Sequence, residues 1–246
     1  MSRTALFISP HLDDVVFSCG GTLAALADRG WRTVLVTAFT ATVLPVTGFA
    51  LACQTDKGLG PEVDYMALRR AEDRDAADIL GVADLRWLGL PEAPHRGYGS
   101  APELFADLRD DDEIWRKLAD ELAALQAELR ADQIFAPQGL GAHVDHRQTI
   151  RAVQEIAGRT PVAWYRDTPY AIRNPDARPF VDARELGAVP IDETLDRKIR
   201  AACAYRSQIG FQFGGPEAVA ASLADFATRE GGERFAGKFN YVAVQP

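Results

Sequence analysis

The sequence predicts a single α/β domain over residues 1–246, built on a mostly parallel, Rossmann-like sheet flanked by helices. Two observations support this fold class. Strand-like and helix-like segments alternate through the first two-thirds of the chain, which is the pattern of a parallel sheet covered by helices. A length of 246 residues is also enough for one sizeable core and is common for a single α/β domain.

Apolar runs rich in β-branched residues predict the strands. The most continuous run, 31–39, suits a strand that is buried on both faces. Two helices are expected to end at Gly30 and Gly81, because glycine readily takes the left-handed conformation that follows a helix. The expected strands are 4–10, 31–39, 85–90, 133–136 and 162–165, and the expected helices are about 20–29, 65–80, 110–130 and 146–156.

Three further segments are less regular. Residues 40–64 contain glycine and proline but show weak periodicity, so we expect a long loop, a kind of segment that often carries function. The acidic run 110–113 is interpreted as a helix start rather than a calcium site, because negative charge in a first turn favours the helix dipole. Residues 171–246 are expected to hold one helix, at about 192–208, and to wall the functional site.

The composition narrows the class of protein. A hydrophobic content of 47% and a charged content of 25% are ordinary for a soluble globular protein. The net charge of −8 weighs against a nucleic-acid partner, because phosphate binding normally needs clustered Lys and Arg. No run approaches the roughly 18 consecutive apolar residues of a membrane span, and no signal peptide is visible, so we expect a cytoplasmic protein without a membrane span.

The cysteines do not predict a site. Cys19, Cys53 and Cys203 are an odd number and show no CxxC spacing, so neither a disulfide framework nor a thiolate zinc site is indicated. We interpret them as small buried apolar residues.

Two clusters of histidine and aspartate follow predicted strands. His11-Leu12-Asp13-Asp14 comes after the first strand, and His143-Val144-Asp145-His146 comes after the fourth. Alone, each cluster could be a turn or a polar helix start. Together they hold three of the four histidines and lie at carboxyl ends of parallel strands, where ligands bind in such sheets. They therefore predict one metal site, whereas His95 is interpreted as a surface loop residue.

Catalytic zinc takes three protein ligands and leaves one position for water. A turn at the strand end can direct His11 and Asp14 to one ion while Asp13 points at the open position and accepts a proton from the water. In the second cluster His146 can bind the ion, His143 can face the substrate, and Asp145 can orient an imidazole. Zinc is the expected metal, and iron(II) or another divalent ion also suits two histidines and one aspartate.

The paired motifs resemble those of the PIG-L/LmbE-like superfamily of N-acetylglucosaminyl deacetylases, in which H-x-D-D is followed by H-x-D-H. The run Arg69-Arg70-Ala71-Glu72 is similar to the R-x-x-E helix of that family, and residues 137–141 and 165–170 resemble segments of its bacterial members. The resemblance extends over roughly residues 4 to 210.

The resemblance implies His11, Asp14 and His146 as zinc ligands and Asp13 as general base. It implies that His143 stabilises the oxyanion or protonates the leaving amine, and that Arg69 contacts the substrate. The first motif departs from the common A-H-P-D-D-E, because Pro10 precedes the histidine, Leu12 replaces the proline and Val15 replaces the glutamate. That glutamate is neither ligand nor base in the matched scheme, so its replacement changes the surroundings of the site and leaves the catalytic set in place.

The expected function is zinc-dependent hydrolysis of the N-acetyl group of an amino sugar or glycoconjugate. Two alternatives stay open: an amidase that acts on a larger N-acyl glycoconjugate, and a non-catalytic Rossmann-like protein that binds a nucleotide or sugar. The second alternative lacks a G-x-G-x-x-G motif after the first strand, and two carboxylates there would repel a pyrophosphate.

Overall fold

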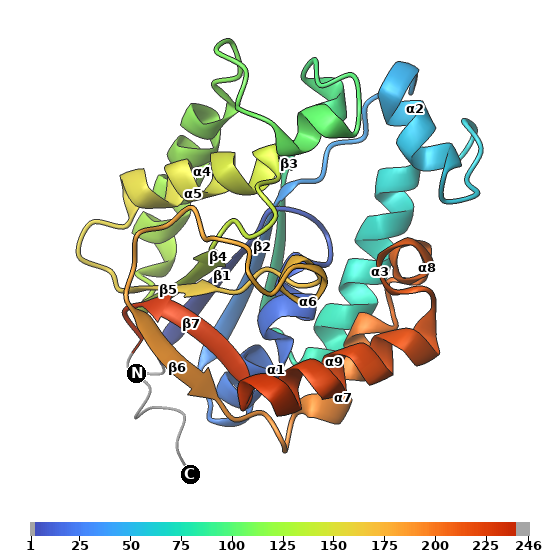
Figure 1. The fold of residues 1–246 in the computed structure, drawn as a ribbon. Helices are drawn as coiled ribbons and strands as arrows, with labels where there is room; N and C mark the ends of the chain where they lie inside the picture. The colour runs from blue at the N-terminus through green and yellow to red at the C-terminus, as the bar shows by residue number, and fades with distance from the viewer. Residues whose placement is uncertain (1–2, 240–246) are drawn as a thin grey trace.

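A computed structural model describes residues 3–239 and contains one seven-stranded sheet (Figure 1). The strand order is β3-β2-β1-β4-β5-β7-β6, and β7 pairs antiparallel with both β5 and β6, whereas the other pairs are parallel. The predicted α/β fold with a mostly parallel sheet is thereby confirmed. The strands are β1 (Thr4–Ser9), β2 (Arg32–Phe39), β3 (Asp84–Leu90), β4 (Gln133–Pro137), β5 (Val162–Tyr165), β6 (Glu185–Val189) and β7 (Glu233–Gly237).

Helices cover both faces of the sheet (Figure 1). α4 and α5 lie on one face, and α1, α3, α7 and α9 lie on the other. The helices are α1 (Asp14–Asp28), α2 (Gly48–Thr55), α3 (Tyr65–Leu80), α4 (Ile114–Leu129), α5 (Val144–Ile156), α6 (Tyr170–Arg173), α7 (Leu195–Ala202), α8 (Arg206–Phe213) and α9 (Pro216–Glu230), with 3-10 turns η1 (Ala93–His95) and η2 (Pro102–Phe105).

The central strand β1 contributes to two hydrophobic cores. Ala5 and Phe7 point to the core under α1 and α3, and Leu6 and Ile8 point to the core under α4 and α5. Because successive side chains of a strand face opposite sides, a strand buried on both faces is apolar at most positions. This explains the continuous apolar runs in the sequence.

Helix α1 begins six residues before the predicted start at residue 20, at Asp14. It is kinked at Cys19, whose φ of −140° and ψ of 25° are not helical. The carboxylate of Glu233, on β7, accepts hydrogen bonds from the backbone N–H groups of Gly21 (2.9 Å) and Thr22 (2.7 Å) after the kink. The side chain of Lys198 donates to the same carboxylate at 2.7 Å, so a buried ion pair ties the C-terminal part of the chain to α1.

Two other expectations need correction. The predicted loop 40–64 contains α2, and the predicted helix 192–208 is divided into α7 and α8 by a turn at 203–205. Of the three cysteines, which are free thiols in the described part of the chain, only Cys19 is buried; Cys53 and Cys203 are half-exposed. Among the described helices, none combines the length and the apolar character that crossing a membrane would require.

The buried ion pair between Lys198 and Glu233 is expected to contribute strongly to the free energy of unfolding. Glu233→Gln leaves a buried ammonium without its counter-charge, so we expect it to lower the free energy of unfolding by about 3 kcal/mol. Glu128→Gln is the matched control, because its partner Arg86 is held at the surface and an exposed pair contributes less than about 1 kcal/mol. Urea denaturation measures both variants, and equal losses would contradict the structural role of Glu233.

Candidate active site

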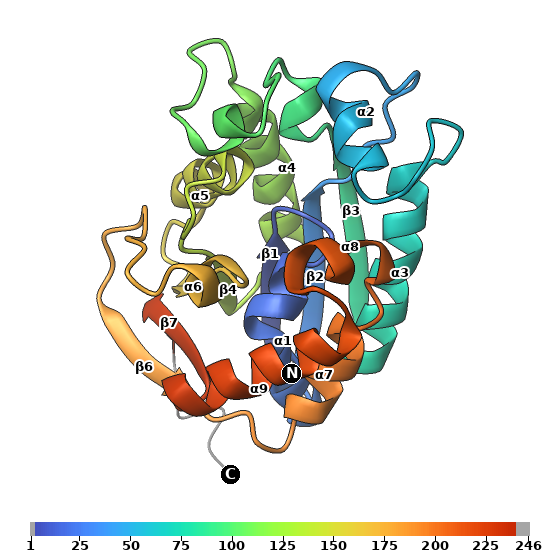
Figure 2. The same cartoon turned by 45° about the vertical axis from the view of Figure 1, so that its right-hand side comes forward.

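The two histidine clusters meet at the carboxyl edge of the sheet, between β1 and β4. The strand order runs outward from this point in both directions, so the loops that leave β1 and β4 diverge and open a crevice. A cavity of about 440 Å³ occupies it, with α2 and α8 on one side and α5 and α6 on the other (Figure 2). Its lining includes His11, Asp13, Asp14, Arg69, Glu92, His143, Asp145 and Tyr170.

A strained turn carries the first cluster from β1 into α1. Asp13 has a φ of 148° and a ψ of −32°, a conformation that is unfavourable for any residue with a Cβ. The turn is held by Ser9 Oγ, which donates to His11 O at 2.6 Å and accepts from Val15 N at 3.2 Å. The side chain of Val15 is buried in the hydrophobic core under α1. A valine therefore suits this position, where the common form of the motif that the sequence resembles has glutamate.

Asp14 lies between two imidazoles. Its Oδ2 is 3.3 Å from His11 Nδ1 and 3.2 Å from His146 Nε2. Ligand atoms bound at 2.0–2.1 Å around a tetrahedral ion are separated by about 3.3 Å, so each of these two distances suits a pair of ligands on one metal ion. His146 Nε2 is buried and, although it lies 3.2 Å from Asp14 Oδ2, it forms no hydrogen bond with that oxygen or with any other atom of the described residues. A metal ion would satisfy this atom.

The three histidines also form a group of their own. Ligand atoms of His11, His143 and His146 all lie within 4.8 Å of one another, which is a possible metal site in itself. The Asp14 oxygen is much closer to His11 and His146 than this limit, and the site therefore has more potential ligands than a catalytic zinc needs.

Two further carboxylates bind the outer nitrogens of the same histidines. Asp145 Oδ2 is 2.9 Å from His11 Nε2, and Asp167 Oδ1 is 2.6 Å from His146 Nδ1. Carboxylates in this position fix the orientation and tautomer of metal-binding histidines. Asp167 also accepts hydrogen bonds from the backbone N–H groups of Gly139 and Leu140, so it holds the loop that precedes the second cluster.

The charges around the site shift several pKa values. Burial raises the pKa of the Asp13 carboxyl to about 7, although the Arg69 guanidinium lowers it. Burial alone would raise the pKa of Asp14, but the imidazoles of His146 and His11 hold it well below its usual range. Burial lowers the pKa of His146, but the Asp14 and Asp167 carboxylates outweigh this effect and bring it to about 9. Asp14 is therefore the carboxylate with the stronger tendency to stay ionised.

Arg69 borders the cavity but is already engaged by protein groups. Its Nη1 donates to Glu92 Oε1 at 2.6 Å, and its Nη2 donates to the carbonyl of Leu12 at 3.1 Å. The same Nη2 is 3.6 Å from Asp13 Oδ2. Glu92 was not predicted from the sequence. This glutamate follows β3 in the loop that lines the cavity. It does not belong to a sequence motif that would have indicated a function.

His143 presents one nitrogen to the cavity. Its Nδ1 accepts the backbone N–H of Asp145 at 3.2 Å, so a neutral ring carries its proton on Nε2. Its ring packs edge-on against those of His11 and Phe105. His95, which was interpreted as a surface loop residue, is half-buried in η1 and borders a smaller neighbouring pocket.

Comparisons with known proteins show which family the chain belongs to. The family model described as PIG-L: GlcNAc-PI de-N-acetylase matches residues 6–157. A 2'-N-acetylparomamine deacetylase from Streptomyces fradiae is 32% identical over 212 residues, which cover 82% of this chain and 72% of that protein. A probable N-acetyl-alpha-D-glucosaminyl L-malate deacetylase 2 from Bacillus cereus is 28% identical over 85% of this chain and 84% of its own length.

A similar solved structure is a deacetylase from the biosynthesis pathway of teicoplanin. It has a TM-score of 0.82 and 25% sequence identity, and the match covers 96% of this chain and 97% of that one. These relatives confirm the deacetylase class that the motifs predicted. Because the family model matches more than half of its residues, the chain belongs to the PIG-L: GlcNAc-PI de-N-acetylase family.

Proposed function

We propose that this protein is a zinc-dependent hydrolase that removes the acetyl group from an N-acetylated amino sugar or its conjugate. One observation carries the proposal: Asp14 Oδ2 lies at a ligand-like distance from one nitrogen of His11 and from one of His146, beside a cavity that Asp13 also lines. His11 Nδ1, Asp14 and His146 Nε2 would hold the ion. A divalent metal there supplies Lewis-acid chemistry, which acidifies a water molecule and polarises a carbonyl oxygen.

Asp13 is suited to act as the general base. Its carboxylate lines the cavity, and its ion pair with Arg69, at 3.6 Å, is longer than a hydrogen bond. The carboxylate can therefore accept a proton from the attacking water. The backbone strain at Asp13 supports this role, because strained conformations are concentrated at functional sites. The nearby Arg69 would place this carboxylate and border the sugar.

His143 and Asp145 would complete the reaction. With its Nδ1 occupied by the Asp145 N–H, His143 offers an Nε2 proton to the oxyanion or to the leaving amine. The side chain of Asp145 acts on His11 instead and holds its Nε2. The amine that leaves must gain a proton as its bond to carbon breaks, and His143, with its Nε2 proton, is suited to give one.

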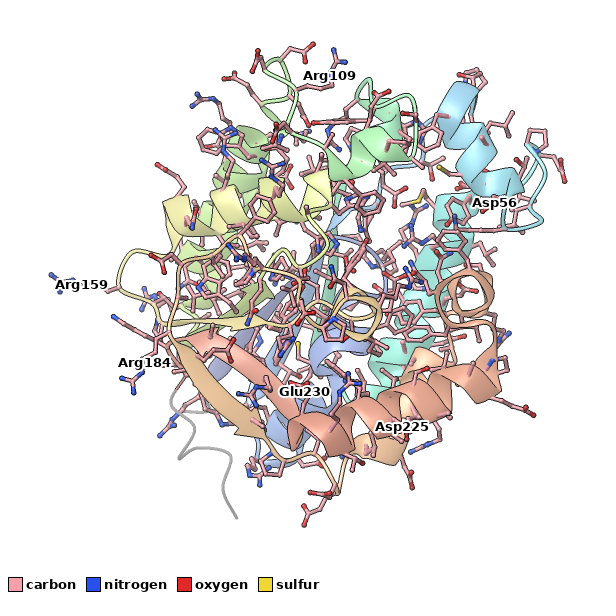
Figure 3. The ribbon with its side chains drawn as sticks, in the orientation of Figure 1. Asp56, Arg109, Arg159, Arg184, Asp225 and Glu230 are labelled. Atoms are coloured by element: carbon pink, nitrogen blue, oxygen red, sulfur yellow. The ribbon has the colours of Figure 1, made fainter. Side chains whose placement is uncertain are left out.

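The rest of the cavity is suited to a sugar conjugate. Polar side chains at its wall, including Asp56 at the end of α2 (Figure 3), Gln208 and Gln212, can bind hydroxyl groups. Aromatic side chains, Phe105 and Phe211 among them, supply apolar surface. A volume of about 440 Å³ is within the range of pockets for ligands of drug size, so there is room beyond the acetyl group.

The proposal is tested by a screen of N-acetylated amino sugars and their conjugates on protein of known metal content. We expect acetate and free amine in equal amounts, loss of turnover after chelation, and recovery with zinc. If iron(II) restores turnover and zinc does not, the catalytic metal is iron(II). Release of longer acyl chains in preference to acetate would favour the amidase. A folded protein that cannot take up zinc, and that binds nucleotide without hydrolysis, would contradict the proposal.

Two variants of Asp13 distinguish the catalytic role of its carboxylate from the effect of its strained backbone on stability. Asp13→Ala and Asp13→Gly both remove a proton acceptor and no ligand, so we expect each to keep zinc and to lose turnover by about 10²-fold or more. The glycine variant should be more stable to urea than the alanine variant by about 1 kcal/mol, because glycine tolerates the φ of 148°. Substantial turnover in either variant would remove Asp13 as the base.

His146→Ala should behave differently from the Asp13 variants. It removes a ligand, so we expect zinc to be lost on dialysis while the fold, followed by circular dichroism, is retained. Elemental analysis measures the metal. A normal zinc content in this variant would exclude His146 from the ligand set and would favour a site built on the other histidines.

A further inference from the structure

A chain of buried charged groups leads away from the metal ligands toward the loop that follows η1. His11 Nε2 is 2.9 Å from Asp145 Oδ2, and the other oxygen of Asp145 accepts from Arg96 Nη2 at 2.6 Å. Arg96 is in turn held by Asp112, whose two carboxylate oxygens accept from Nε at 3.1 Å and from Nη2 at 3.0 Å. The order of groups is therefore Asp112, Arg96, Asp145 and His11.

Arg96 is fixed on every side. Its guanidinium lies 5.0 Å from the centre of the Phe39 ring, and its side chain is only 8% exposed. Its remaining terminal nitrogen, Nη1, donates to the carbonyl of Pro91 at 2.6 Å. A planar guanidinium with three separate anchors has one available orientation, in contrast to the flexible ammonium of a lysine.

The two oxygens of Asp145 have different partners. Asp145 is fully buried, and a buried carboxylate is stable only when its charge and its lone pairs are matched. Arg96 supplies the positive charge at Oδ1, which leaves Oδ2 to accept from His11 Nε2 and from the backbone N–H of Ala93 at 3.1 Å. His11 then carries its proton on Nε2, and its Nδ1 lone pair faces Asp14.

We propose that Arg96 is a positioning residue for the metal site: by holding Asp145, it directs the Nδ1 lone pair of His11 toward the metal and so raises metal affinity. This inference rests on the metal site of the proposed function. Without the guanidinium, Asp145 loses its charge partner and its fixed plane, and the ring of His11 loses the partner that selects its tautomer. Carboxylates that orient metal-binding histidines typically change metal affinity by about 10–100-fold, and Arg96 would act through one of them.

A purely structural role for Arg96 makes a different prediction. Arg96 and Asp112 together hold the segment between η1 and α4, and Tyr98 also donates to Asp112 at 3.0 Å. If Arg96 serves only to anchor this segment, substitution of Arg96 and substitution of Asp112 should change zinc affinity equally. Asp112 does not contact Asp145, so Asp112→Asn is the matched control, because it weakens the anchor and retains the Arg96 guanidinium.

The test compares zinc dissociation constants, measured by competition with a chromophoric chelator, for the full chain and the variants Arg96→Met, Arg96→Lys and Asp112→Asn. We expect Arg96→Met to weaken zinc binding by about 10–100-fold. We expect Asp112→Asn to change it by less than about 3-fold, and Arg96→Lys to lie between Arg96→Met and the unmodified chain. Thermal denaturation of the metal-free variants shows which of them fold.

Unchanged zinc affinity in Arg96→Met, or an equal loss in Asp112→Asn, would overturn the inference. If Arg96→Met does not fold, Arg96→Lys decides it: a loss greater than that of Asp112→Asn supports the inference, and an equal or smaller one overturns it. The proposed function fails separately, because it requires the unmodified chain to bind zinc and to release acetate. Zinc binding and turnover in the unmodified chain, with unaltered zinc affinity in both Arg96 variants, would remove only the role of Arg96.

Discussion

The buried carboxylate of Asp14 lies within 3.3 Å of one nitrogen of His11 and of His146, and the surrounding structure serves to hold these three groups in place. Ionisable groups removed from water are stable only when each is paired. The outer nitrogen of each imidazole therefore has its own carboxylate, Asp145 or Asp167. The inner nitrogens of both imidazoles then lie beside the same oxygen of Asp14, which groups three potential metal ligands.

The parallel sheet makes this convergence possible. β1, β4 and β5 are neighbours in the sheet, and the groups at the site follow their carboxyl ends: Asp14 after β1, His146 after β4 and Asp167 after β5. Residues far apart in the sequence thus meet: His11 and Asp145 are 134 positions apart, and the hydrogen bond from Thr168 N to Ser18 Oγ spans 150 positions. The added strands β6 and β7 extend the sheet, and Glu233 of β7 caps the second half of α1.

The sequence predicted the five parallel strands and the position of the site because both have local patterns. Continuous apolar runs indicate strands that are buried on both faces, and the clusters at 11–14 and 143–146 directly follow two of them. The early start of α1 at Asp14 was not predictable, because it depends on a strained backbone at Asp13 rather than on a capping side chain. The strands β6 and β7 are short and include Gly187 and Gly237, so they lack a strand pattern.

The residues that support the ligands were harder to find than the ligands. Glu92 and Arg96 are single charged residues in loops, and nothing near them in the sequence distinguishes them from solvated charges. Asp167 had two available signals, since it lies in the segment 165–170 that resembles bacterial members of the family and comes two residues after β5 at the same edge of the sheet. Arg96 had none, because its function depends on Asp145, which lies 49 residues away.

The central claim is that Asp13 and Asp14, although adjacent, have different tasks, and that one imidazole from each cluster joins Asp14 at the metal. Anomalous diffraction at the zinc absorption edge, from crystals of the zinc-loaded protein, tests this directly. We predict one ion, bound by His11 Nδ1, an oxygen of Asp14 and His146 Nε2, with Asp13 and His143 facing the cavity without binding it. An ion bound by His143, by Asp13 or by His11 Nε2 would contradict the account.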